Sequence, residues 1–153
     1  MNFRTEGARK AYAKALEAYR FLSFNLAVEH LDKAIGKSPE YAEAWFLKAQ
    51  IFQEVEHPDL EVVLSHALGL DATRFPHGWV ELARVQWELG KYEQGLASLE
   101  RMQALGIFGL TGETEAKRRW VEAGLQFSAK AMASVQHLEP DGPDCLNEAD
   151  SLS

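Results

Sequence analysis

The sequence has little that would support a disulfide or a surface for polyanions. Its single cysteine, Cys145, excludes an intramolecular disulfide and a CxxC metal site. The chain has 16 lysine and arginine residues against 23 aspartate and glutamate residues, which gives a net charge of −7. This charge disfavours binding to nucleic-acid phosphates and to anionic membrane surfaces. We therefore expect no nucleic-acid partner.

Long apolar runs are also missing. No stretch approaches the roughly 20 apolar residues that a transmembrane helix requires, so we expect no direct membrane insertion. Residues 1–20 mix alanine, lysine and glutamate in an amphipathic pattern, without the apolar core of a signal peptide. Taken as written, the sequence predicts a cytoplasmic protein.

The patterns that usually carry chemistry are absent too. The histidines are His30, His57, His66, His77 and His137; they form no HExxH motif, and no two are three or four residues apart. There is no GxSxG, GxGxxG or P-loop sequence. We predict no metal site, no cofactor and no enzymatic activity. An enzymatic alternative, a hydrolase that uses His77 and Glu81, lacks a third group to orient the pair.

The chain does contain a series of helix-sized segments separated by turn signals. We expect helices over about residues 5–21, 24–36, 42–55, 59–69, 78–89, 92–105 and 112–136. Pro39, Pro58 and Gly90 mark turns between them. No segment alternates apolar and polar residues as a half-buried strand would. The predicted fold is all-α, with residues 138–153 as an extended or disordered tail.

One interval, of about 34 residues, recurs through these segments. It separates Trp45 from Trp79, and it also separates the alanines that follow them, Ala49 and Ala83. Small residues at such positions let helices approach closely, and large ones fill the gaps between helix pairs. The repeat positions that we predict to be structural are Ala15, Trp45, Ala49, Trp79, Leu82, Ala83, Gly90, Tyr92, Trp120 and Gly124.

This pattern resembles the tetratricopeptide repeat (TPR) family over about residues 5–137. The resemblance implies an α–α superhelix of three helix pairs, at about residues 8–41, 42–74 and 75–106. A long capping helix at about 112–136 would end this TPR solenoid, because its Trp120 and Gly124 repeat only the first half of the pattern.

Arrays of this kind are protein-binding scaffolds whose first helices line a concave face. The register places a peptide-binding groove at Tyr12, Leu16, Tyr19, Arg20, Phe46, Gln50, Gln53, Val80, Arg84 and Trp87. One TPR subfamily holds a C-terminal carboxylate with lysine and asparagine on these helices. The matching positions here are Tyr12, Leu16, Leu47, His77 and Glu81, so this mode is not expected. We predict a non-enzymatic scaffold that binds a protein or peptide segment.

Two further predictions concern assembly and compartment. The chain could alternatively homo-oligomerise through the apolar segment 106–110 and the last helix. In addition, the sequences at 127–132, 138–140 and 147–153 resemble the junction between a TPR domain and a β-propeller in OmpA-family envelope proteins of Gram-negative bacteria. Some of those proteins belong to type IX secretion machinery. This resemblance implies an envelope or secretion assembly, a periplasmic or outer-membrane-associated location, and a chain that is a fragment.

Overall fold

This computed structural model describes residues 3–107, 110 and 112–138. These residues contain seven helices. They are α1 (Phe3–Arg20), α2 (Phe24–Lys37), α3 (Ala42–Glu54), α4 (Leu60–Leu70), α5 (His77–Glu88), α6 (Tyr92–Ala104) and α7 (Gly112–Leu138). The all-α prediction is confirmed for these residues, which contain no strand. Apart from Leu138, which ends α7, the predicted tail at 138–153 lies outside the described residues.

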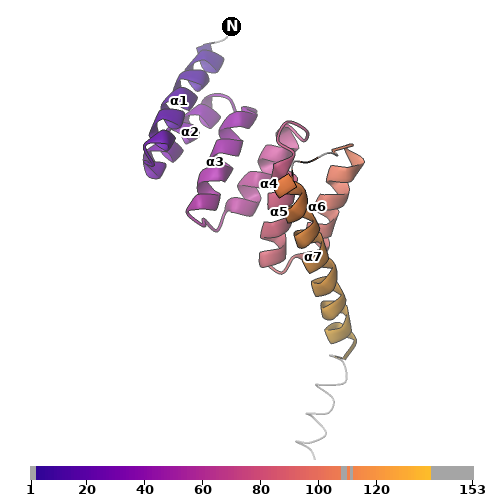
Figure 1. Cartoon of the computed structure of the whole chain (residues 1–153). Helices are drawn as coiled ribbons and strands as arrows, with labels where there is room; N and C mark the ends of the chain where they lie inside the picture. Colours follow the sequence, from indigo (N-terminus) through magenta and orange to yellow (C-terminus); the bar gives the residue numbers. More distant parts are fainter. Residues whose placement is uncertain (1–2, 108–109, 111, 139–153) are drawn as a thin grey trace, which may run out of the picture.

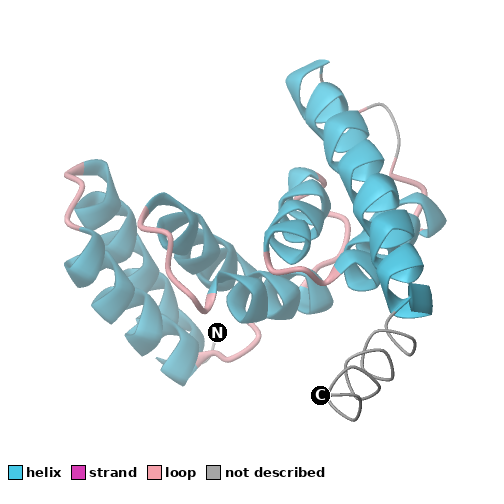
Figure 2. Ribbon diagram, turned by 90° about the horizontal axis from the view of Figure 1, so that it is seen from below, coloured by secondary structure: helices cyan, strands magenta, loops and turns pink. Residues whose placement is uncertain are grey.

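The helices stack in chain order into a curved row (Figures 1 and 2). α1 packs on α2, α3 on α4 and α5 on α6, while α2 contacts α3 and α4 contacts α5. α7 lies against both α5 and α6 at the end of the row (Figure 1). The chain is therefore organised as three helix pairs followed by one long helix, as the repeat predicted.

Small side chains bring the helices of the first pair close together. The buried face of α1 consists of four alanines at helical spacing, Ala8, Ala11, Ala15 and Ala18. The facing residues of α2 are also mostly small: Ala27, Leu31 and Ala34. In the next two pairs, the repeat alanines Ala49 and Ala83 are buried in the same way. Because a methyl group is the largest side chain at most of these points, the helix axes can approach closely.

Each of the repeat tryptophans Trp45 and Trp79 bonds to the loop that precedes its own helix. Trp79 is buried, and its Nε1 donates a hydrogen bond of 2.7 Å to the carbonyl oxygen of Ala72, in the loop before α5. Trp45 Nε1 donates in the same way to the carbonyl oxygen of Pro39, at 2.9 Å, in the loop before α3. Around Trp79 the core also takes in two predicted repeat residues, Leu82, which is buried, and Tyr92, which is half-buried.

The repeat interval also appears in the backbone of the turns. Leu22, Glu56 and Gly90 have positive φ angles of 60°, 54° and 78°, and they follow one another at the interval that separates the repeat tryptophans. In each turn, the N–H of the next residue bonds to the carbonyl five positions earlier: Ser23 to Ala18, His57 to Phe52 and Lys91 to Gln86. This is the Schellman ending of a helix, and it folds each second helix back along the first.

The last helix departs from the predicted register. Val121 and Leu125 are the buried residues of α7, whereas Trp120 is 62% exposed. Trp120 therefore does not occupy the buried repeat position that the pattern predicted, although its ring meets Trp87 edge-on. The physical reason is that α7 runs from Gly112 to Leu138 without a turn, so no second helix folds back over Trp120 within the described residues. Gly124 does act as a small contact residue, because it packs against the indole of Trp87.

Two side chains of the predicted assembly segment 106–110, Ile107 and Leu110, pack inside the chain. Ile107 and Leu110 are half-buried and pack against the core formed by α3 to α7. Residues 108 and 109 lie outside the described residues. The two described apolar side chains of this segment therefore contribute to the core rather than to an open patch.

Candidate functional site

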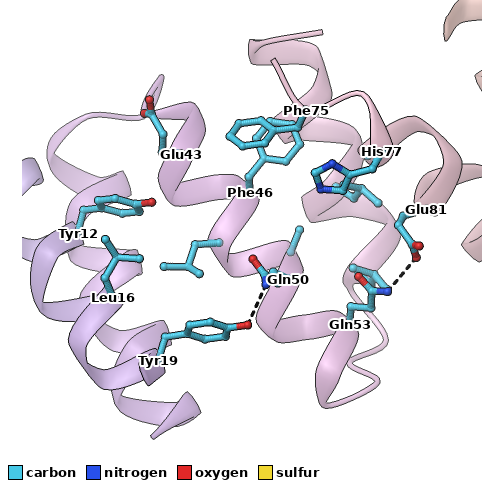
Figure 3. A pocket seen from close by; sticks show the side chains of 15 residues that line it. Tyr12, Leu16, Tyr19, Glu43, Phe46, Gln50, Gln53, Phe75, His77 and Glu81 are labelled. Carbon is cyan, nitrogen blue, oxygen red and sulfur yellow. Dashed lines mark hydrogen bonds between the residues drawn. The ribbon is translucent and has the colours of Figure 1, made fainter. Parts of the chain in front are cut away.

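A cavity of about 280 Å³ opens on the inner side of the row, between α1, α3 and α5 (Figure 3). α1 supplies Tyr12, Leu16 and Tyr19 as one wall. α3 crosses the middle, and the opposite wall comes from Phe75 in the loop before α5 and from the start of α5. The first helices of the three pairs therefore form the cavity together.

The cavity has an apolar floor and a polar rim. Its apolar lining residues are Leu16, Phe46, Leu47, Ala49, Leu60, Leu64 and Phe75. Phe46 and Phe75 lie against each other, with ring centroids 4.1 Å apart. The polar lining residues are Tyr12, Tyr19, Glu43, Gln50, Gln53, His77 and Glu81. This combination can accept an apolar side chain and hydrogen-bond the backbone that carries it.

Hydrogen bonds fix the polar residues between α1 and α3. Gln50 Nε2 donates to Tyr19 Oη at 2.8 Å, and that hydroxyl donates to Glu54 Oε1 at 2.7 Å. The hydrogen bond to Glu54 raises the pKa of Tyr19, and burial adds to the effect. Burial also raises the pKa of Tyr12, next to Tyr41 and Glu43. Both tyrosines therefore stay neutral at physiological pH and keep their hydroxyl protons.

A second network joins α3, α5 and α7 around Glu81. Gln53 Nε2 donates to Glu81 Oε2 at 2.9 Å, and Arg84 Nε donates to the same oxygen at 3.0 Å. Lys117 of α7 pairs with Glu81 Oε1. Burial opposes the charge on Arg84, but its bonds to Glu81 and Glu88 outweigh that and raise its pKa. Glu81 is thus held by three partners, one from each of the helices α3, α5 and α7.

Six of the ten predicted groove residues line this cavity: Tyr12, Leu16, Tyr19, Phe46, Gln50 and Gln53. Arg20 is exposed at the end of α1 and does not line it. Arg84 lies one turn beyond Glu81, beside a neighbouring depression that Gln53 and Glu88 also line.

The other two predicted groove residues, Val80 and Trp87, do not line the cavity. Val80 is 1% exposed, so its side chain belongs to the core. Trp87 packs beneath α7: its ring lies edge-on to Trp120 at 4.9 Å, and its Nε1 donates to Ser128 Oγ at 3.1 Å. Both positions were assigned from the repeat register, which does not show that α7 folds over the far end of α5.

The prediction also missed lining residues on the far wall, chiefly Phe75, His77 and Glu81. A signal for two of them was present in the sequence. The positions that match the carboxylate-binding subfamily are Tyr12, Leu16, Leu47, His77 and Glu81, and all five line the cavity. Their residue types do not suit a carboxylate, but the positions themselves coincide with the lining of the cavity.

The described part of the chain lacks the residues for a metal site and for a membrane-spanning helix. No group of three or more histidine, cysteine, aspartate or glutamate side chains there could hold a metal ion. None of the described helices is both long and apolar enough to cross a membrane.

The comparisons with known proteins bear on the fold. No family model and no curated protein matches the sequence. A solved structure, "TPR2B-domain:pHsp70-complex of yeast Sti1", superposes with a TM-score of 0.63 at 16% identity, covering 79% of this chain and 97% of that chain. The chain has a TPR-like fold. At this level of identity the likeness establishes the fold alone.

The yeast domain is seen in a complex with pHsp70. The comparisons give no support to the resemblance between the C-terminal part of this chain and the OmpA-family envelope proteins.

Proposed function

We propose that this TPR-like domain binds a peptide segment of another protein in the cavity between α1, α3 and α5. The observation that carries the proposal is the combination of an apolar floor, centred on Phe46 and Phe75, with a rim of tyrosine and glutamine side chains. Glutamine amides can bond both the N–H and the carbonyl groups of a peptide.

The size of the cavity favours a peptide over a small-molecule ligand. Its volume of about 280 Å³ falls at the lower limit of small-molecule sites, which span about 300–1,000 Å³. A space of this size suits one or two large side chains. Lining residues of α1 and α5 lie on opposite sides of this space, with α3 between them (Figure 3).

Charge indicates what kind of segment fits. The lining includes Glu43 and Glu81 but neither lysine nor arginine. Glu43 is already paired with Arg74, and Glu81 is already paired with Arg84 and Lys117. A free C-terminal carboxylate would therefore meet two other carboxylates in the lining and no lysine or arginine to neutralise its charge. We propose an internal segment with a large apolar anchor, and not an acidic C-terminal tail.

The yeast neighbour supports the class of partner at the level of the fold. It is a TPR domain in complex with pHsp70, and the present chain shares that fold. The lining residues of the present cavity then decide the chemistry of the ligand, and they favour an apolar anchor.

A selection from a random peptide library displayed on phage tests this function. We expect enriched peptides to share a large apolar residue and to lose at least about tenfold in affinity for the Leu16→Glu variant. The control is Leu26→Glu, which changes the same residue type at an exposed position of α2. A peptide ending in an acidic, free carboxyl terminus should not bind. Equal binding to both variants, or no enrichment at all, would place the site elsewhere.

The compartment is a separate proposal. Residues 1–20 predict a cytoplasmic chain, whereas the second resemblance predicts an envelope or secretion assembly. Immunodetection of the native chain in cytoplasmic, periplasmic and membrane fractions separates these two predictions. Detection only in the cytoplasmic fraction would remove the envelope role.

A further inference from the structure

One face of α7 is apolar and open. It carries Ala116, Trp120, Ala123, Phe127 and Ala131, and the small polar residue Ser134 ends it; all six are exposed. Their spacing of three and four residues places them along one stripe of the helix. The two aromatic residues are the most prominent, with Trp120 62% and Phe127 76% exposed. The opposite side of α7, with Val121 and Leu125, is buried against α5 and α6.

The other end of the row is charged. α1 is the first helix of the stack (Figure 1), and the exposed residues along its length include Glu6, Lys10, Lys14 and Glu17. A charged outer face is what keeps the end of a helical array in water. The α1 end of the array is therefore polar and well solvated, whereas the α7 end exposes an apolar stripe to water.

We propose that the α7 stripe is a dimer interface, in which two copies of this chain pair their α7 helices in antiparallel orientation. A head-to-tail contact would place the apolar stripe on the charged face of α1. Two α7 stripes, by contrast, match each other in character. Such a contact uses the same surface on both copies. It is therefore complete in a dimer and leaves no equivalent surface free to bind a third copy.

Size complementarity along the stripe supports the antiparallel orientation. With the two-fold axis at Phe127, Trp120 of each copy faces Ser134 of the other, and Ala123 faces Ala131. Each large residue away from the axis then meets a small one, which is how facing helices interdigitate. At the axis the two Phe127 rings form an aromatic pair.

Charge also permits two copies to meet here. α7 contains four cationic residues, Lys117, Arg118, Arg119 and Lys130, and three anionic residues, Glu113, Glu115 and Glu122. The helix is thus close to neutral although the chain as a whole carries −7. The cavity on α1, α3 and α5 shares no residue with the stripe. The dimer would therefore present two open grooves.

Sedimentation equilibrium of the full chain over a wide concentration range tests the interface. We expect the wild-type chain to reach twice its monomer mass, and Phe127→Ser to raise the dissociation constant at least about tenfold. The matched control is Phe21→Ser at the turn between α1 and α2, where the phenylalanine is also 76% exposed; it should dimerise like the wild type. A wild-type monomer, an unaffected Phe127→Ser dimer, or equal loss in both variants would overturn the proposal.

Cross-linking tests the orientation. In a Cys145→Ser background, chains with Ala123→Cys and chains with Ala131→Cys are treated with a short bismaleimide, separately and as a mixture. The antiparallel pairing predicts cross-linked dimers in the mixture in clear excess over either chain alone. Equal or greater cross-linking in the separate samples would overturn the antiparallel arrangement.

Discussion

Gly124 packs against the indole of Trp87 so closely that a Cβ built at residue 124 would lie 2.4 Å from Trp87 Cζ2. The same indole donates to Ser128 Oγ and meets Trp120 edge-on. Three residues of α7 therefore hold one side chain of α5. This contact is the joint between the third helix pair and the last helix, and it exists because residue 124 has no side chain.

The first prediction is that Gly124→Ala weakens this joint. Overpacking a close contact costs about 1–3 kcal/mol, which exceeds the roughly 1 kcal/mol that alanine gains over glycine inside a helix. We expect a net loss of about 1 kcal/mol in the free energy of unfolding, measured by urea denaturation. In the control, Gly69→Ala in α4, a Cβ would meet nothing within 4 Å, so that variant should be at least as stable as the wild type. Equal stabilisation by both changes would show that the indole moves aside freely.

The same joint shows how far the sequence could predict the site. Six of the seven residues that the repeat register placed on the inner side of α1 and α3 line the cavity, and Arg20 at the end of α1 does not. The register failed for Val80 and Trp87, because their exposure depends on how the surrounding helices, and α7 above all, pack against α5. No repeat interval encodes the placement of α7, which follows a break at residues 105–111 and runs on for 27 residues.

The second prediction contrasts two tryptophans that the register treats alike. Trp79 is 8% exposed and donates to the carbonyl of Ala72, whereas Trp120 is 62% exposed. Trp79→Ala should cost roughly 3–5 kcal/mol, as truncation of a buried aromatic does. Trp120→Ala should cost about 1 kcal/mol or less, since little of its ring is buried. Thermal melting of both variants measures the difference, and equal midpoints would contradict the assignment of Trp120 to an open face.

The fold was predicted better than the site for a physical reason. Alanine and tryptophan at fixed intervals decide how helices pack within and between pairs, and this packing is local in sequence. The far wall of the cavity depends instead on Phe75, in a loop, and on His77 and Glu81, at the start of α5. A loop has no periodic pattern, so Phe75 gave no signal before its ring was seen against Phe46.

The third prediction concerns the left-handed turn that recurs once in every repeat. Gly90 has φ 78°, and the equivalent residues Leu22 and Glu56 adopt the same left-handed conformation with side chains present. That conformation costs an L-residue roughly 1–2 kcal/mol, a cost that glycine avoids. Because a Cβ at Gly90 would meet nothing within 4 Å, Gly90→Ala should lose about 1–2 kcal/mol through the backbone alone.

The control for this prediction is a glycine with ordinary helical geometry. At Gly36, near the end of α2, a Cβ also meets nothing within 4 Å, and the backbone is not left-handed. Gly36→Ala should therefore stabilise the chain by about 0.4–1 kcal/mol, because alanine has less freedom to lose on folding. Urea denaturation of the two variants should thus give changes of opposite sign. A Gly90→Ala variant as stable as Gly36→Ala would mean that the turn does not require its left-handed residue.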